Sequence, residues 1–320
     1  MAFWNKLPKP FFAMAPMKDV TDIAFRALVA RKGKPDVFWT EFVSADGLYH
    51  TREIAKMDDT VNPLMRDLLI GEGQRPVVAQ IFSSKPEMIT YATKLVAELG
   101  FDGVDLNMGC PDRSVEKQGA GAALVKNPAL AAELIRVTKE AGSLPVSVKT
   151  RIGYNTENLD EWLTALLEAE PAAITLHLRT RKELSLVRAD WELMKKAVAI
   201  RNKVAPGVLL IGNGDIESLE EGRQLAAETG CDGIMIGRGM FGNPWVFAGR
   251  TEHGLEEKLA ALIEFAHNFE TISPPKSFAL LKKHIKAFVS GFAGAADLRA
   301  KLMAADNATG LEHILRENQL

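Results

Sequence analysis

Cys110 is the residue of this 320-residue chain whose type and setting most clearly suit chemistry. It follows the apolar run FDGVDLNM and lies in a turn between Gly109 and Pro111. The apolar run with its β-branched residues predicts a buried parallel strand, and the glycine and proline predict a tight turn that ends it. A thiol held there by rigid neighbours is placed to react, whereas most free cysteines are small buried hydrophobes. This stretch alone leaves both interpretations open.

Lys149 and His177 also end apolar runs, VSVK and AAITLH. A lysine in such a position forms a Schiff base, stabilises an anion or extends to solvent, and the sequence does not choose among these roles. A lone histidine there either serves a site or is simply packed.

Two glycine turns follow the last two predicted strands and favour a phosphate site. In parallel barrels, turns at these positions bind phosphate through backbone N–H groups and a helix N-terminus. Arg238, between Gly237 and Gly239, adds a forked cation. The loop GAGA at 119–122 is too short to bind phosphate alone, and we expect it to let the chain bend close to its neighbours. The other glycine turn comprises Asn213, Gly214 and Asp215.

Basic residues gather in two segments of an otherwise balanced chain, whose net charge is −2. This balance gives no overall field that attracts nucleic acid, so an anionic partner must meet a local patch. One segment follows His177 and contains Arg179, Arg181, Lys182 and Arg188. The other lies near the C-terminus and contains Lys276, Lys282, Lys283, Lys286, Arg299 and Lys301.

Eight strand-like runs alternate with helical patterns up to about residue 245, which predicts a (β/α)8 TIM barrel. An open doubly wound sheet is the alternative, but it needs a glycine-rich fingerprint after the first strand, where this chain has MAPMK. In such barrels the working groups lie where strands end, so the polar residues named above should meet at one face. The predicted strands are 11–15, 37–42, 77–82, 103–107, 146–149, 173–177, 208–212 and 233–237. The predicted helices are 22–32, 86–99, 128–141, 160–169, 191–204 and 219–229, and 60–75 reads as an irregular excursion or a short hairpin.

Residues 255–318 show helical periodicity without strand candidates, and Pro274-Pro275 separates one helix from the next. We therefore expect two domains, a catalytic barrel over 1–250 and a helical domain over 251–320.

Several classes of protein are disfavoured. No apolar run of about 18 residues is present, which argues against a membrane span, and the proline-interrupted start lacks a signal-peptide core. Two cysteines in a chain of this length favour a reduced, cytoplasmic setting. The six histidines have no zinc-ligand spacing, so no metal site is expected. We see no long amphipathic seam and expect a monomer.

Taken in order, the motifs resemble those of the tRNA-dihydrouridine synthases. The likeness spans about 14–250 and extends into the tail segment KHIKAFVSGF. Aldolases and other flavin barrels share the architecture but not NMGCP and HxRTR together. This chain departs from the common pattern at Leu178, where glycine is frequent, and at Lys18-Asp19, where smaller residues are frequent. The matching motifs are MAPM and VTD within 14–22, NMGCP at 107–111, KTR at 149–151, HLRTR at 177–181, and GRG and GNPW within 237–245.

The resemblance implies an FMN-dependent enzyme that uses NADPH to reduce the C5–C6 bond of specific uridines in tRNA to 5,6-dihydrouridine. Cys110 is the implied general acid, giving a proton to C5 while flavin N5 delivers hydride to C6. Asn107 and Arg179 are implied to meet the uracil, and the helical domain to bind tRNA. The residues themselves agree, since a buried lysine stabilises an anionic reduced flavin and an ordinary thiol stays protonated at neutral pH. The implied cofactor contacts are Pro16, Met17, Lys18, Gln80, Lys149, His177, Asn213, Gly214, Asp215, Gly237 and Arg238.

Other functions stay open from the sequence alone. The substrate could be ribosomal RNA rather than tRNA, or a free pyrimidine or other enone. A lysine Schiff-base aldolase and a non-catalytic RNA-binding protein on a barrel scaffold are the alternatives from other classes.

Overall fold

A computed structural model describes residues 3–318, and its eight strands form one parallel sheet with the neighbour order β1-β8-β7-β6-β5-β4-β3-β2. Each strand lies within two residues of its predicted bounds, so the prediction of a TIM barrel is confirmed. The outer limits of the two predicted domains, residues 1 and 320, lie outside the described range. The strands are β1 (Phe11–Met14), β2 (Phe38–Ser44), β3 (Val77–Phe82), β4 (Gly103–Met108), β5 (Val146–Arg151), β6 (Ala173–His177), β7 (Leu209–Asn213) and β8 (Gly233–Ile236).

The sheet closes on itself between its first two strands. Ala13 bridges Val37, and the Met14 N–H donates to the Val37 carbonyl over 3.0 Å. This seam is shorter than the other pairings, which each run over three to five residue pairs. Because the strands are buried on both faces, their apolar runs are nearly continuous, as parallel barrels require.

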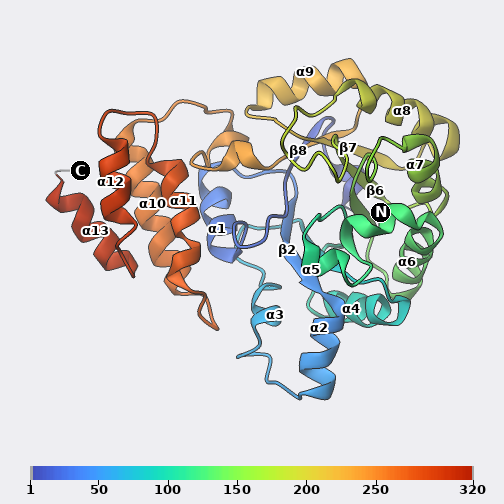
Figure 1. Cartoon of the computed structure of the whole chain (residues 1–320), viewed down its shortest axis with the longest axis horizontal. Helices are drawn as coiled ribbons and strands as arrows, with labels where there is room; N and C mark the ends of the chain where they lie inside the picture. Colours follow the sequence, from blue (N-terminus) through green and yellow to red (C-terminus); the bar gives the residue numbers. More distant parts are fainter. Residues whose placement is uncertain (1–2, 319–320) are drawn as a thin grey trace.

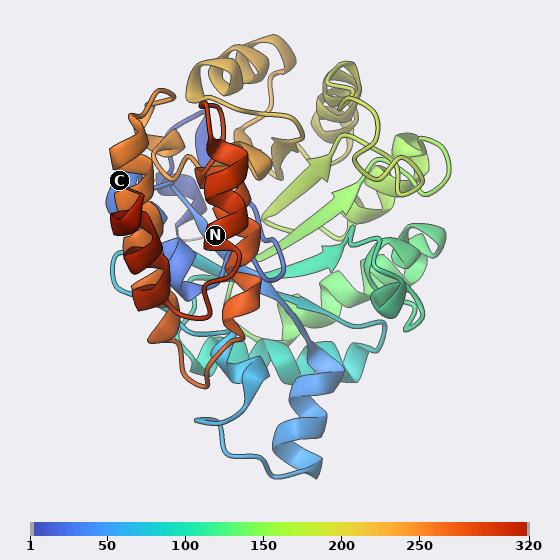
Figure 2. The same cartoon turned by 60° about the vertical axis from the view of Figure 1, so that its left-hand side comes forward.

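Helices cover the outside of the barrel (Figure 2). Several begin at side-chain caps; the Asp22 carboxylate, for example, accepts from the Phe25 N–H over 3.0 Å. The six helices predicted between strands are all present, within a residue of their expected ends. They are α1 (Ile23–Lys32), α4 (Pro86–Glu98), α6 (Pro128–Ala141), α7 (Leu159–Glu168), α8 (Glu192–Val204) and α9 (Leu219–Thr229), and a short α5 (Arg113–Glu116) follows β4.

The connection from β2 to β3 extends away from the barrel (Figure 1). It contains α2 (Ala45–Tyr49), which continues into a π-helical turn over His50–Ile54, and α3 (Pro63–Arg66). Ser44 and Asn62 cap the two helices through their side-chain oxygens. The segment at 60–75 is therefore an excursion with one short helix, and the alternative of a hairpin is wrong.

In the described residues, four α-helices form the C-terminal part, and α10 and α11 pack beside α1 (Figure 1). The Phe25 ring of α1 lies 5.5 Å from Phe265 and 4.6 Å from the His284 ring, measured between centroids. The helix break at Pro274-Pro275 is confirmed, because α10 ends before it. These helices are α10 (Leu255–Glu270), α11 (Lys282–Phe288), α12 (Ala295–Leu302) and α13 (Ala308–Glu317).

A buried ion cluster joins the C-terminal part to the barrel. The Lys276 ammonium, with 2% of its side chain exposed, pairs with Glu41 of β2 and lies 3.6 Å from Asp67 and 3.9 Å from Asp22. The expectation that Lys276 belongs to an exposed basic patch is therefore wrong, because three carboxylates surround it. Exposed basic side chains of this part include Lys283 and Lys286.

Candidate active site

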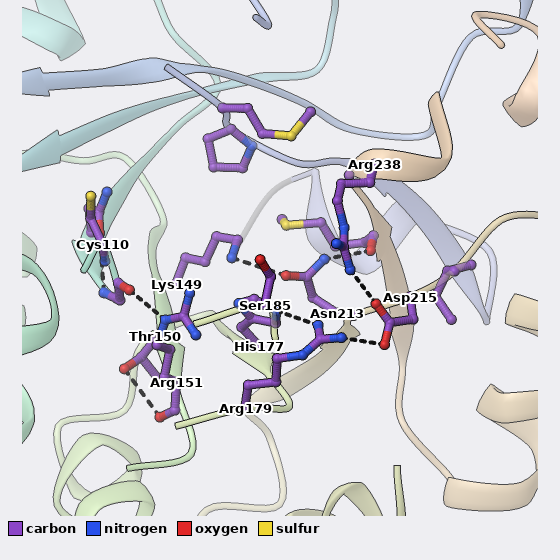
Figure 3. Close-up of a pocket in the computed structure, with 18 of the residues that line it drawn as sticks. Cys110, Lys149, Thr150, Arg151, His177, Arg179, Ser185, Asn213, Asp215 and Arg238 are labelled. Atoms are coloured by element: carbon purple, nitrogen blue, oxygen red, sulfur yellow. Dashed lines mark hydrogen bonds and ion pairs between the residues drawn. The ribbon is translucent and has the colours of Figure 1, made fainter. Parts of the chain in front are cut away.

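A cavity of about 550 Å³ opens at the carboxyl ends of the strands (Figure 3). Its volume lies within the range of cofactor and small-ligand sites. As the strand-end argument predicts, the structure brings these residues together at one face, and all but one of the predicted site residues line this cavity. They are Pro16, Met17, Gln80, Asn107, Cys110, Lys149, His177, Arg179, Asn213, Gly214, Asp215, Gly237 and Arg238.

Lys18 is the exception. It follows β1 in a loop, and its ammonium lies 2.5 Å from a carboxylate oxygen of Asp67 rather than against the cavity. The structure therefore places Lys18 in the acidic surroundings of Lys276, not among the groups that line the site.

Cys110 lies at one side of the cavity, on a turn that is held from two directions (Figure 3). Asn107 Oδ1 accepts from the backbone N–H groups of Gly109 and Cys110, over 3.1 and 2.9 Å. The Cys110 carbonyl accepts from the Ala122 N–H over 2.9 Å. Gly121 has φ +61°, and a Cβ there would lie 2.7 Å from that carbonyl, so the expected close bend of the glycine loop is confirmed.

The thiol of Cys110 is half-buried, and burial raises its pKa. Because the thiolate is disfavoured, the sulfur keeps its proton at neutral pH. A protonated thiol at a cavity wall can act as a general acid.

Lys149 faces the cavity from β5, and its Nζ donates to Asn213 Oδ1 over 3.1 Å. Burial, together with the charge of Arg151, lowers the pKa of Lys149 to about 8. The ammonium is therefore charged at neutral pH but poorly solvated, which favours an anion beside it.

His177 is neutral in this setting. Burial and the positive charges of Lys149 and Arg151 hold its pKa well below the usual value. Arg179 Nη1 lies 3.1 Å from His177 Nε2. A guanidinium only donates, so Nε2 carries the lone pair and Nδ1 carries the proton.

The turn after β7 organises two arginines. Gly214 has φ +138° and Asp215 has φ +58°, and the Asp215 carboxylate pairs with both Arg179 and Arg238. These partners lower the pKa of Asp215 against the effect of its partial burial. Arg238 keeps 59% of its side chain exposed, whereas Arg179 is buried and also donates to the Val187 carbonyl.

Arg151 is a cavity residue that was missing from the predicted site. It is 7% exposed and donates to the carbonyls of Gly109, Thr180 and Leu184, over 2.9, 3.0 and 2.9 Å. One guanidinium thus joins the Cys110 turn to the loop after β6. Because side chains alternate along a strand, Arg151 lies on the same face of β5 as Lys149. This alternation could have identified Arg151 as a cavity residue from the sequence.

Two arginines of the basic loop after β6 are occupied by carboxylates. Arg181 donates to both carboxylate oxygens of Glu116, over 2.9 and 3.0 Å from Nε, and Arg179 is paired with Asp215. The expectation that the whole loop is free to hold phosphates is therefore wrong. Lys182 and Arg188 are its exposed cations.

Within residues 3–318, no group of three or more His, Cys, Asp or Glu side chains is arranged to hold a metal ion. In the same range, no helix has the length and apolar character needed to cross a membrane.

Replacing Lys149, which lines the cavity, should stabilise the protein when no anion is bound there. The folded pKa of Lys149, about 8, lies below its unfolded value of about 10.5. Wild-type stability should therefore rise with pH between these two values, and below about pH 8 the protein bears the full free-energy cost of the charged, poorly solvated ammonium. We expect Lys149→Met to add about 1–3 kcal/mol at pH 7 and nothing near pH 10.5. Urea unfolding across this pH range measures it.

The exposed Lys94 of α4 provides the matched control, and Lys94→Met should change stability by less than about 0.5 kcal/mol at every pH. A Lys149→Met protein that is less stable than wild type at pH 7 would contradict the assignment of a desolvated ammonium.

Residues 13–319 match the family model described as dihydrouridine synthase (Dus). A protein of Staphylococcus aureus strain MRSA252, named probable tRNA-dihydrouridine synthase, is 41% identical over 320 residues, which cover 98% of this chain and 95% of that protein. The probable tRNA-dihydrouridine synthase 2 of Bacillus subtilis strain 168 is 42% identical over 305 residues, with coverages of 94% and 91%.

Solved structures share the fold at low sequence identity. Histamine dehydrogenase from Rhizobium sp. 4-9 superposes with a TM-score of 0.53 and 12% identity over 85% of this chain, which spans about half (50%) of that chain. A 2-naphthoyl-CoA reductase gives a TM-score of 0.52 with 10% identity, over 74% of this chain and 49% of that chain.

Proposed function

The chain belongs to the dihydrouridine synthase family, and from this membership we propose that it reduces the C5–C6 bond of specific uridines in tRNA to 5,6-dihydrouridine, with FMN in the cavity and NADPH as reductant. The observation that supports this most is the pairing of a proton-holding thiol, Cys110, with a desolvated ammonium, Lys149, in one cavity of cofactor size.

The residues present suit an anionic flavin nucleotide. Lys149 and Arg238 supply positive charge; Arg238 pairs with Asp215 through one nitrogen but keeps 59% of its side chain exposed. The glycine turns after β7 and β8 bring backbone close to the cavity. Glycine is required at Gly239, because a Cβ there would lie 2.3 Å from the Ile216 carbonyl. We assign the turns and Arg238 to the phosphate, and Lys149 to the ring system, where a positive charge favours the reduced, anionic form.

When bound, the flavin supplies the hydride that adds to C6 of the uracil. The chain itself supplies the proton. The Cys110 thiol donates it from Sγ to C5, the carbon that becomes electron-rich when hydride adds to C6. Asn107 has one N–H left for the base, because its other amide atoms serve Gln80 and the Cys110 turn. Arg179 acts on His177 and Asp215, so we assign it to holding this wall of the site.

The uridine has to leave its stack to reach a cavity at the end of a barrel. The exposed cations Lys182 and Arg188 lie on the loop whose Ser185 lines the cavity, and Lys283 and Lys286 are exposed on α11. Lys283 also lies 3.6 Å from Asp19. We therefore assign phosphate contacts to Lys182, Arg188 and Lys286, and binding should weaken steeply with salt.

Turnover with defined substrates tests the proposal. The purified protein should be yellow and, with NADPH, should convert uridine in an unmodified tRNA transcript into a nucleoside that is heavier by two hydrogen atoms on mass spectrometry. Ribosomal RNA and free uridine monophosphate are the control substrates. Reduction of either control in preference to tRNA, or of none of the three, would overturn the proposed substrate.

A further inference from the structure

A hydrogen-bonded chain of side chains begins in the core of the barrel, at Asp105 of β4. Its Oδ1 accepts from the Ser147 hydroxyl over 2.5 Å, and its Oδ2 accepts from Gln80 Nε2 over 2.7 Å. Asp105 and Ser147 are 0% exposed and Gln80 is 1% exposed. Water therefore does not substitute for any of these partners, and each bond matters more than it would at a surface.

The chain continues from Gln80 to the turn that carries the thiol. Gln80 Oε1 accepts from Asn107 Nδ2 over 3.2 Å, and Asn107 Oδ1 accepts from the backbone N–H groups of Gly109 and Cys110. Three links thus connect the buried carboxylate to the backbone of Cys110.

The groups at the two ends of this row of hydrogen bonds require the same direction of donation along it. An ionised carboxylate only accepts hydrogen bonds, and a backbone N–H only donates. If both amides were turned over, the Gln80 carbonyl would face the Asp105 carboxylate and the Asn107 NH₂ group would face the N–H groups of the turn. The observed polarity leaves each amide with one N–H that serves neither neighbour, and both lone pairs of Asn107 Oδ1 are used by the Cys110 turn. Gln80 and Asn107 both line the cavity, so each has a donor for a group bound there.

We propose that Asp105 is a positioning residue, which sets the amide orientation of Gln80 and, through it, of Asn107, so that Asn107 holds the Cys110 turn in place and the cavity floor offers N–H donors. The inference rests on the proposed function only for what the thiol then does. A carboxylate is an expensive choice for a core position: burial raises the pKa of Asp105 to about 6, and an apolar side chain would pack there without that cost.

Reversing the polarity of the chain tests this role. Asn107→Asp places a second carboxylate at the end of the row opposite Asp105. Gln80 then lies between two carboxylates, and its single NH₂ group can donate to only one of them. Adding Asp105→Asn removes the conflict, because Gln80 can turn over and the amide at position 105 can donate to it while still accepting from Ser147. The readout is the alkylation rate of Cys110 by iodoacetamide in the cofactor-free protein, followed by peptide mass spectrometry, with thermal unfolding alongside.

We expect Asn107→Asp to speed Cys110 alkylation at least about threefold, because the turn opens more often, and to lower the unfolding temperature. The double variant D105N/N107D should return to within about twofold of wild type, as coupled neighbours do. Asp105→Asn alone should stay within the same limits, since its oxygen can still face Gln80. Ser147→Ala is the matched control: it removes one donor to Asp105 but leaves the polarity intact, so Cys110 should react at the wild-type rate. The buried Cys231 is the internal reference.

An unchanged rate in N107D, or a double variant that reacts as fast as N107D, overturns the proposal. If N107D does not fold, a folded double variant supports the proposal and an unfolded one overturns it. No step of this experiment uses turnover, so its failure is distinct from a failure of the proposed reaction.

Discussion

Cys110→Ala should leave the protein yellow while lowering dihydrouridine formation by about 10²–10⁴-fold, the range over which a positioned general acid acts. The thiol is the group whose pKa burial raises at the cavity wall, so its loss removes the proton that C5 requires. Reduction of the bound flavin by NADPH should proceed at the wild-type rate, because that half of the cycle does not use Cys110. Rapid-mixing absorbance for flavin reduction and mass spectrometry of digested tRNA measure the two halves separately.

Cys231→Ala is the matched control for this substitution. Cys231 is also a free, buried cysteine, but it lies just before β8, at the opposite end of that strand from the cavity. Its alanine variant should reduce tRNA normally. Wild-type turnover by the Cys110 variant would remove the acid role, and loss of colour in that variant would indicate that Cys110 serves cofactor binding instead.

Lys276→Met should destabilise the protein by about 3–5 kcal/mol at neutral pH, the usual cost of removing one partner from a buried charge cluster. Glu41, Asp22 and Asp67 would then face one another without the ammonium. Burial already raises the pKa of Asp22 to about 6, and without the opposing charge of Lys276 this pKa would rise further. The variant should therefore regain stability as the pH falls from 7.5 to 5.5 and Asp22 takes up a proton. Denaturant unfolding at pH 5.5 and pH 7.5 measures both effects.

The exposed Lys286 of α11 offers the comparison. Lys286→Met lies in the same helical part, and its effect should stay within about 0.5 kcal/mol at either pH. If Lys276→Met were equally mild, or if its deficit grew at low pH, the cluster would not hold the two parts of the chain together as described.

The sequence was sufficient to predict the barrel because buried parallel strands leave long apolar runs with clear ends. It also located most of the cavity, since strand ends of such a barrel meet at one face. Short helices could not be predicted in the same way. The helix α2 and its π-helical turn, over 45–54, are too brief to leave a helical period, and their capping residue Ser44 is a common surface residue.

Pairing of charges was the main feature that could not be predicted. Lys276 and Glu41 are separated by 235 positions, and Arg181 and Glu116 by 65. A count of basic residues in a segment therefore described both as free cations. The structure shows instead that Lys276 and Arg181 form ion pairs with carboxylates from distant parts of the sequence. Lys18 is likewise paired, with Asp67.

The C-terminal part also contacts the barrel next to the short seam between β1 and β2, and these contacts have a structural role. Lys276 pairs with Glu41 of β2 and lies 3.9 Å from Asp22, the residue that caps α1. Helix α10 packs on Phe25 of that same helix. A protein cut after residue 250 would lose the Lys276 ammonium from among these carboxylates and would uncover the buried Phe25 of α1, which favours aggregation. Truncation is thus a poor way to ask whether the tail recognises RNA, and charge reversal at the exposed Lys286 asks the same question of an intact barrel.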